Sequence, residues 1–194
     1  MIIHLFCIVP LLTFGANNYI GHSRGDFRQL QAFNAPIDSS NVDMALIEAG
    51  VIYFTNEYRS KKYRSLLSYN ENLSMAAHTH SEQMQIHHVF DHVNLRNREL
   101  STLEKRALYV GYTRYTTLAE NILYAYLDLN QIVSYKELCN FIVNSFISSK
   151  GHQENLLNKD VDEIGCGIYF DKQTKDGVWS FYFTQDFGSR SIFH

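Results

Sequence analysis

The sequence predicts an α+β fold, a three-layer αβα sandwich around a small antiparallel sheet. Helical patterns run from residue 42 to about residue 150, and clear strand patterns follow them. A length of 194 residues suits one ordinary domain, and 45% hydrophobic residues give enough apolar surface for a core. Because the helices come first and a hairpin comes last, the order favours an α+β or αβα arrangement over a wound parallel sheet.

Composition and charge exclude several classes of protein. Charged residues make up 19% of the chain, a globular balance that rules out a disordered, collagen-like or coiled-coil protein. Seventeen basic and twenty acidic residues give a net charge of −3, which supplies no electrostatic footprint for nucleic acid. Three cysteines are too few for a disulfide framework. We therefore expect a globular protein with no nucleic-acid partner.

Residues 1–15 have the pattern of a secretory leader. An apolar run from Leu5 to Leu12 is followed by small residues at Thr13 and Gly15, which suit cleavage after Gly15. About twelve apolar residues are too few to span a bilayer as a helix. The usual basic residue is missing, since only His4 precedes the run. The leader predicts export to the cell envelope, the outer surface or the medium.

Cys7 leaves a second interpretation of the leader open, in which cleavage before this cysteine is followed by acylation and membrane attachment. The residues around Cys7 match that pattern less well than simple cleavage. Residues 16–41 are polar and lack a sustained period, so we expect a flexible tether there. The folded domain is then expected over residues 42–194.

The first helix of the domain is expected over Val42 to Leu67. One apolar stripe contains Ala45, Ala49 and Ile52, and further apolar residues on the opposite side predict that the helix is covered on two faces. The stretch Arg59 to Arg64 is basic and is expected to be solvated.

Three more helices follow. Asn70 is expected to cap a helix that reaches about His87. Ser101 with Glu104 predicts a capping box for a short helix ending near Gly111, and Ser134 with Glu137 predicts another for a helix through Phe146.

Strand patterns replace helical ones after Lys150. Apolar residues alternate with glycines from Ile164 to Ile168, and aromatic residues alternate with polar ones from Val178 to Phe187. This pair predicts an antiparallel hairpin, in which the alternating aromatic residues are expected to pack in the sheet core. Leu118 to Leu123 is a candidate third strand.

A series of short motifs runs through the domain in a fixed order. They are Asn56-x-x-Arg59, Leu73-x-x-Ala76-Ala77-x-x-His80-Ser81-x-x-Met84, Phe90-Asp91-His92, Glu120-Asn121-Ile122, Ser149-Lys150-Gly151-His152-x-x-Asn155-Leu156-Leu157, Glu163-Ile164-Gly165-Cys166-Gly167 and Thr184-Gln185-Asp186-Phe187-Gly188. Together they resemble the CAP superfamily (cysteine-rich secretory protein, antigen 5, pathogenesis-related; also called SCP-like) in its compact bacterial form. The resemblance implies an αβα sandwich in a protein that is exported.

The resemblance also implies a central cleft that collects two histidines and one or two acids. By position, His92 and His152 are the two histidines and Glu120 is one acid. Ser149 occupies the place of the second acid, and Phe146 replaces a tryptophan of the family. The expected cleft is therefore His92, Glu120, Ser149 and His152.

Two chemistries are open for this cleft. Two neutral imidazoles could hold zinc or another divalent metal, and Glu120 could act as general base on a metal-bound water. Alternatively, Glu120 orients one histidine by a hydrogen bond and no metal binds. No cofactor is certain. His80, on the inner face of its helix, is expected to be a satisfied structural residue.

Two further pairs have competing interpretations. Asn56 and Arg59 are expected to tie the first helix to neighbouring loops through backbone hydrogen bonds, in preference to forming a recognition pair. In the domain, Cys139 and Cys166 are expected to be buried small hydrophobic residues, with a disulfide as the alternative.

The function expected from these features is an exported, monomeric envelope or surface protein. It would bind an unknown ligand, host protein or lipid through the cleft without catalysis. The alternatives are a metal-dependent, peptidase-like hydrolase that uses the same cleft, and lipid or sterol binding. The sequence does not choose between them, because one fold hosts many functions.

Overall fold

A computed structural model describes residues 17–22, 24–128, 131, 133–172 and 178–191. Its helices are α1 (Asn17–Ile20), α2 (Arg24–Gln29), α3 (Gln31–Asn34), α4 (Met44–Lys61), α5 (Glu71–His87), α6 (Leu103–Tyr109), α7 (Tyr135–Ser148) and α8 (Lys150–Leu156). Its strands are β1 (Ser68–Tyr69), β2 (Tyr115–Asp128), β3 (Glu163–Asp171) and β4 (Val178–Arg190). They form one sheet in the order β1-β3-β4-β2.

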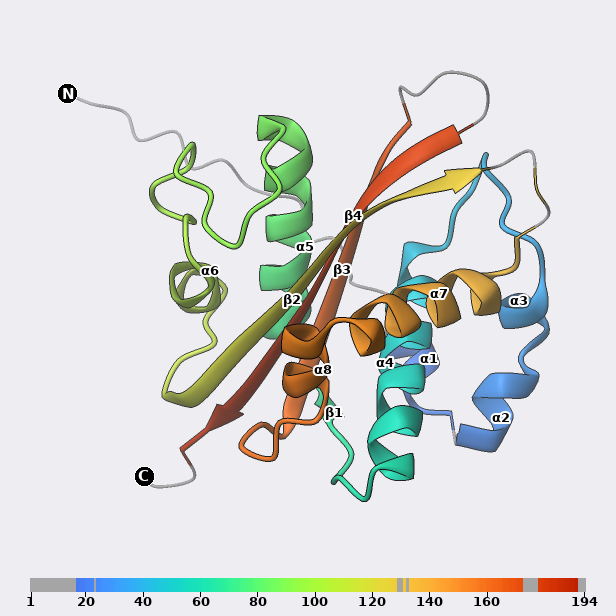
Figure 1. The fold of residues 1–194 in the computed structure, drawn as a ribbon, viewed down its shortest axis with the longest axis horizontal. Coiled ribbons are helices and arrows are strands. Elements are labelled where there is room, and N and C mark those ends of the chain that lie inside the picture. The colour runs from blue at the N-terminus through green and yellow to red at the C-terminus, as the bar shows by residue number, and fades with distance from the viewer. Residues whose placement is uncertain (1–16, 23, 129–130, 132, 173–177, 192–194) are drawn as a thin grey trace.

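The helices cover both faces of this sheet, so the predicted three-layer αβα sandwich is confirmed. Figure 1 shows α5 and α6 on one side of the sheet and α4, α7 and α8 on the other. The predicted hairpin is the antiparallel pair of β3 and β4. The third strand is longer than predicted, because β2 pairs with β4 along its whole length. The short parallel pair of β1 with β3 was not predicted.

The two faces of the sheet differ in character. On the α4 and α7 side, Phe181, Phe183 and Phe187 of β4 join the main apolar core, as the alternating aromatic pattern predicted. On the α5 side, the neighbouring residues of β4 include polar Thr184 and Asp186, both fully buried. Polar side chains are therefore buried between the sheet and α5.

Glycines let α5 lie directly against β3. An ideal Cβ on Gly165 would lie 2.1 Å from the backbone nitrogen of Ser74, and one on Gly167 would lie 2.1 Å from that of His78. Backbone atoms cannot move aside for such a contact, so a larger residue would push α5 away from the sheet.

Helix boundaries follow the capping signals with two corrections. Asn70 caps α5, and Ser134 with Glu137 forms the predicted capping box of α7. The cap of α6 is Thr102, not Ser101; the Ser101 hydroxyl accepts from Lys105 Nζ instead. The first helix ends at Lys61, six residues before the predicted Leu67, because the chain leaves the helical conformation at Tyr63.

The predicted tether over residues 16–41 is wrong for its described part. The three short helices α1 to α3 lie in this segment, and Phe27 and Phe33 are buried in the main core. Phe33 packs over Gly50 of α4, where the absence of a side chain makes room for its ring. The apolar residues of this segment are spread over three helices of four to six residues, which are too short to show a sustained period in the sequence.

The two cysteines of the domain are free and buried, which confirms the non-disulfide interpretation. The Cys139 thiol donates to the backbone oxygen of Ile47 over 3.3 Å. Among the described residues, we find no helix with the length and apolar character that crossing a membrane requires. The predicted leader, residues 1–15, lies outside the described residues.

Candidate functional site

Two neighbouring residues of β2 reach into the two outer layers of the sandwich. The Glu120 carboxylate contacts side chains from α6 and from the loop after α5. The Asn121 side chain donates to the backbone oxygen of His152 on α8, at 3.2 Å. Successive strand residues face opposite sides, so this order fixes which groups can meet. The Glu-Asn pair joins the two halves of the expected cleft around the edge strand.

Both oxygens of the Glu120 carboxylate have partners. Oε1 lies 2.8 Å from Nδ1 of His92, and Oε2 accepts a hydrogen bond from the guanidinium of Arg106. Glu120 and Arg106 are buried. Nη1 of the Arg106 guanidinium donates to the backbone oxygen of Leu100 at 3.3 Å. A buried, charge-assisted pair of this kind fixes the carboxylate in position.

Opposing effects act on the Glu120 carboxyl. Burial alone would raise its pKa, but the hydrogen bond from His92 and the positive charge of Arg106 outweigh burial, so the pKa is lowered. Glu120 is therefore ionised at neutral pH. A carboxylate with a lowered pKa is a weak proton acceptor, so Glu120 is badly suited to act as general base.

A second carboxyl lies across the strand pair from Glu120. Asp186 of β4 is the register partner of Glu120 and is fully buried. Burial, together with the charge of Glu120, raises the pKa of Asp186 well above its usual range, although Arg106 opposes this. Two carboxyls that share one buried site cannot both ionise, so Asp186 holds the proton and Glu120 the charge.

His80 borders the same network from α5. Its ring is fully buried, and its Nε2 lies 3.7 Å from Oε1 of Glu120, beyond hydrogen-bond distance. Burial lowers its pKa to about 4, despite the opposing charge of Glu120, so the ring is neutral. Its structural placement agrees with the prediction, but neither ring nitrogen has a hydrogen-bond partner within the described chain, so "satisfied" does not describe it.

His92 is the part of this network that reaches the surface. It lies in the loop after α5, and 52% of its side chain is exposed. The hydrogen bond to Glu120 raises its pKa, against the opposing effect of burial. Because Nδ1 faces the carboxylate, Nε2 is the ring nitrogen left for an external group. The predicted pair of His92 and Glu120 is thus in place.

His152 and Ser149 lie on the other side of β2. His152, on α8, packs the edge of its ring against Phe146 with ring centres 5.3 Å apart. Burial and the positive charge of His92 lower its pKa. Ser149 is the junction between α7 and α8, and its side chain caps neither helix. Within the described chain, the His152 ring makes no hydrogen bond to Glu120.

These residues do not fit a three-ligand metal centre. In the ranges that the structure describes, no group of three or more His, Cys, Asp or Glu side chains is placed to hold a metal ion. Each Glu120 oxygen already accepts a hydrogen bond, one from His92 and one from Arg106, so the carboxylate positions these two side chains. A site of His92 and His152 alone stays a prediction. No catalytic step through a metal follows from this arrangement.

An aromatic patch, defined here as Phe90, Tyr124, Tyr126 and Tyr182, adjoins His92 on the same side of the sheet. Phe90 precedes His92 by two residues and lies 6.1 Å from the Tyr124 ring and 6.5 Å from the Tyr182 ring. Tyr124 and Tyr182 face each other across β2 and β4 with ring centres 4.7 Å apart. Phe90 is 51% exposed and Tyr126 is 63% exposed. Grouped, exposed aromatic side chains mark binding surfaces more often than single ones do.

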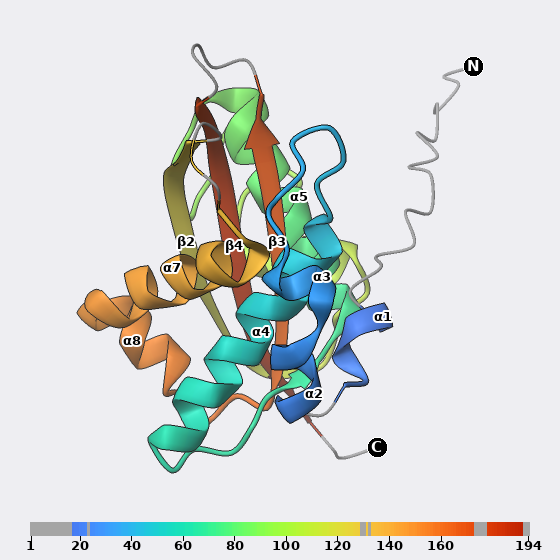
Figure 2. The same cartoon turned by 90° about the vertical axis from the view of Figure 1, so that its right-hand side faces the viewer.

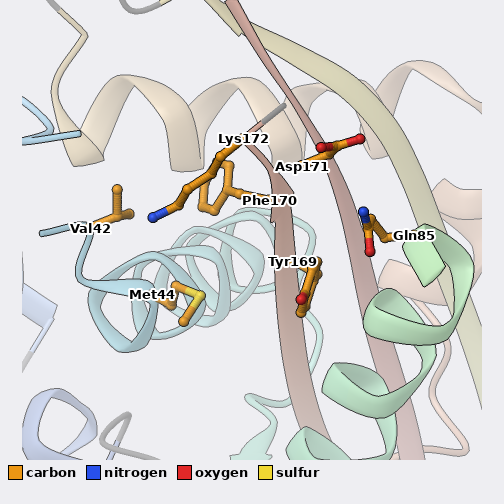
Figure 3. A pocket seen from close by; sticks show the side chains of 7 residues that line it. All are labelled: Val42, Met44, Gln85, Tyr169, Phe170, Asp171 and Lys172. Atoms are coloured by element: carbon orange, nitrogen blue, oxygen red, sulfur yellow. The ribbon is translucent and has the colours of Figure 1, made fainter. Parts of the chain in front are cut away.

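A separate hollow lies between α4, the end of α5 and the end of β3. It has a volume of about 390 Å³ and is lined by Val42, Met44, Gln85 and residues 169–172. Figure 3 shows the Lys172 side chain reaching across it toward Val42. None of the predicted cleft residues is in its lining, so the hollow is distinct from the site around Glu120.

Sequence reasoning missed Arg106, Asp186 and the aromatic patch. Nothing in the pattern of α6 marks Arg106 as buried, because its partner lies in a different element. Asp186 was visible in the Thr-Gln-Asp-Phe-Gly motif but was given no role. The alternation of Tyr124 and Tyr126 was a usable signal, since it continues the predicted strand on the face of Glu120.

Known proteins share this sequence pattern and fold. The CAP pattern, described as the cysteine-rich secretory protein family, matches residues 52–187. The membrane protein YlbC of Bacillus subtilis (strain 168), described as uncharacterised, is 28% identical over 143 residues, which are 74% of this chain. Those residues span 34% of YlbC, so the chain covers only about a third of that relative's length.

Two solved structures have a similar fold. An outer surface protein of Borrelia burgdorferi has a TM-score of 0.56 at 21% identity, with 73% of this chain and 90% of that chain covered. An extracellular protein of Bacillus anthracis str. Ames that contains an SCP domain has a TM-score of 0.57 at 23% identity, with 86% of this chain and 50% of that chain covered. These similarities establish the fold.

Proposed function

This chain belongs to the CAP family of cysteine-rich secretory proteins, and from that premise we propose that it is an exported surface protein that binds a ligand or partner without catalysis. The binding surface would consist of His92, the aromatic patch beside it and, across the edge of β2, the neighbouring His152. Recognition by exposed aromatic side chains around one polar group is a common design of protein interfaces.

The commitment of Glu120 carries this proposal. Its two carboxylate oxygens are used by His92 and Arg106, and its pKa is lowered despite burial. A general base needs a pKa near the working pH, and the pKa of Glu120 is instead lowered. The network therefore suits a role in holding His92 at the surface, where an imidazole can donate or accept a hydrogen bond from a bound partner.

Export is supported by the leader pattern of residues 1–15 and by the two solved structures, one an outer surface protein and one an extracellular protein. Cell fractionation with an antibody to the chain tests it; recovery in the cytosolic fraction alone contradicts export. Metabolic labelling with palmitate separates the two leader interpretations, since only acylation at Cys7 predicts a label.

The binding role is tested on an array of extracellular-matrix proteins and surface glycans. A Phe90→Ala/Tyr124→Ala variant removes two rings of the patch, and loss of such anchors is expected to weaken binding at least about tenfold. The matched control is Leu108→Ala/Tyr109→Ala, which removes two exposed apolar side chains from α6. Equal binding by the two double variants, or no array member bound by the wild type, would contradict the proposal.

Hydrolysis is tested separately. A broad peptide library is incubated with the wild type and with His92→Ala in the presence of zinc, and equilibrium dialysis measures the bound metal. We expect no cleavage that depends on His92 and no stoichiometric zinc. Zinc-dependent cleavage that His92→Ala abolishes would replace the binding proposal by a hydrolase.

A further inference from the structure

The most exposed large apolar side chain among the described residues lies far from the aromatic patch, in the loop that connects α4 to β1. Tyr63 is 96% exposed. Figure 2 shows this loop at the lower end of the molecule, beyond the last turn of α4. With nearly all of its surface in solvent, the Tyr63 side chain contributes almost nothing to the core.

The backbone at Tyr63 is also unusual. Its φ is 56°, in the left-handed region that favours glycine. Two hydrogen bonds close the end of α4 around it: the Tyr63 N–H donates to the Ser60 oxygen at 3.1 Å, and the Arg64 N–H donates to the Arg59 oxygen at 2.9 Å. This is the Schellman arrangement, whose left-handed position is usually glycine. A tyrosine here strains the backbone, and its exposed side chain gains no buried contact that would compensate for the strain. This points to a role outside folding.

Basic residues flank Tyr63 in the sequence. Every residue from Ser60 to Leu66 is exposed, and the stretch holds Lys61, Lys62 and Arg64 without an acidic residue. Lys61 pairs with Glu57 at 3.3 Å. Within the described chain, Lys62 and Arg64 form no ion pair. The loop is therefore a positive, aromatic tip on a chain whose net charge is −3.

The base of this tip is fixed. The buried Arg59 side chain donates to the Ser65 oxygen at 2.7 Å and to the backbone oxygens of Leu156 and Asn158 at the end of α8. Asn56 exchanges two hydrogen bonds with the backbone of Leu67. The backbone of the loop is held at both ends, so little further backbone entropy is lost when the exposed side chains bind.

From these observations we propose that residues 60–66, here called the basic tip, dock the protein onto an anionic lipid surface. Lysine and arginine side chains are drawn to anionic headgroups, and tyrosine prefers the interface between headgroups and acyl chains. The basic tip carries basic side chains and a tyrosine on the same loop. This inference does not depend on the proposed role of His92 and the aromatic patch, which belong to other elements.

Vesicle co-sedimentation of the full chain tests this inference. Vesicles of phosphatidylcholine are compared with vesicles that contain 30% phosphatidylglycerol, and the ratio of the two partition coefficients cancels any contribution of the apolar run in residues 5–12. We expect a ratio well above one that falls in 0.5 M NaCl, because salt screens exposed charges. Inorganic phosphate at 10 mM should leave the ratio unchanged, whereas capture of free phosphate at the tip would lower it.

Three variants make the test specific. Lys62→Gln/Arg64→Gln should lower the ratio roughly 25-fold, at about fivefold per cation. Lys105→Gln/Lys136→Gln removes the same charge from α6 and α7 and should leave the ratio close to its wild-type value after correction for net charge. Tyr63→Gly should lower vesicle binding while raising the midpoint of thermal unfolding, because glycine relieves the left-handed backbone.

Two kinds of result would overturn the docking proposal. A ratio near one for the wild type, or equal losses in the two double-glutamine variants, would overturn the proposal. Loss of vesicle binding in Tyr63→Gly together with lower thermal stability would also overturn it, because a structural role for Tyr63 predicts that combination. Array binding through the aromatic patch should be the same in all three variants, so a failure here is distinct from a failure of the proposed function.

Discussion

Arg59 on α4 and Arg106 on α6 are both buried, but different groups accept hydrogen bonds from their guanidinium groups. Arg59 donates only to backbone oxygens, those of Ser65, Leu156 and Asn158. Arg106 bonds the carboxylate of Glu120 and the backbone oxygen of Leu100. Backbone oxygens do not titrate between pH 3 and 9, whereas carboxylates and histidines do. One arginine is therefore held by a fixed frame and the other by a titrating network.

This difference separates a structural device from a candidate site. The Arg59 frame ties three backbone segments together and confirms the expected tethering role of Asn56 and Arg59, although Arg59 itself is buried and not solvated as its basic neighbours suggested. The Arg106 network instead places an ionised carboxylate, a protonated carboxyl and a surface histidine within one cluster. Such clusters occur at functional sites more often than in ordinary cores.

The largest effect is expected for Arg106→Met. Without the guanidinium, Glu120 would be buried beside Asp186 with only His92 to balance it, and breaking a buried pair in this way costs about 3–5 kcal/mol. Glu120 has a lowered pKa in the wild type, so its contribution to stability is present above the unfolded pKa near 4.5 and is lost as the pH falls through the folded pKa. Urea unfolding at pH 7.5 and pH 4 should therefore show a larger loss at pH 7.5. An equal loss at both pH values would remove the distinction between the two arginines.

Arg59→Met should destabilise the protein by about 2–4 kcal/mol, because it leaves three backbone oxygens without their donor. The free energy of unfolding should fall by the same amount at pH 7.5 and pH 4, since these partners do not titrate. The same urea measurements check it, and a marked pH dependence of the loss would show that a titrating group is part of this frame.

Asp186→Asn should change stability by less than about 1 kcal/mol near pH 4 and below, where the carboxyl it replaces is largely protonated in both the folded and the unfolded state, and should stabilise the protein relative to the wild type at neutral pH. In the wild type the raised pKa means that the folded state keeps a proton which the unfolded state releases above about pH 3.8, so stability falls as the pH rises from there. Asparagine does not titrate, so the variant should become more stable relative to the wild type as the pH increases. Thermal unfolding from pH 4 to pH 8 measures this, and a variant that becomes relatively weaker at higher pH would contradict the assignment of the proton to Asp186.

The smallest effect is expected for His92→Gln, under about 1 kcal/mol, because half of the side chain is in solvent. The raised pKa of His92 means that its contribution is complete below the unfolded pKa near 6.5 and disappears as the pH rises through the folded pKa. The stability difference from the wild type should therefore be greatest near pH 5.5 and vanish near pH 9. Following the His92 Cε1 proton by NMR gives the folded pKa directly, and a value at or below 6.5 would contradict its coupling to Glu120.

The architecture could be predicted because its signals are local. Asn70, Ser134 and Glu137 mark helix starts through hydrogen bonds within four residues, and the alternation around Ile164 and Phe181 gives the hairpin. Thr102 shows the limit of such signals, because two adjacent hydroxyl residues can both fit a cap and only the final path of the chain selects one. The end of α4 was missed since tyrosine is not expected in a left-handed position.

The site could be predicted only in part. The family resemblance placed His92 and Glu120 in one cleft, and the structure brings them within 2.8 Å of each other. It could not supply Arg106, whose meaning depends on being buried opposite a carboxylate from another element. Nor could it supply Phe90 against Tyr182, a contact that requires the loop after α5 to fold back on the sheet. Long-range pairing of single residues leaves no period in a sequence.

The burial of Phe27 and Phe33 shows that the folded domain starts earlier in the chain than the family pattern does. The family pattern begins at residue 52, yet the interior of the sandwich is completed by two rings that precede it by more than a full helix of chain. A protein trimmed to the matched residues would lose both rings together with residues 44–51, the first part of α4 and the position of Gly50, and would expose the core that they cover. The family pattern covers the part of this domain that related proteins share, whereas the part that packs together as one core begins before residue 52.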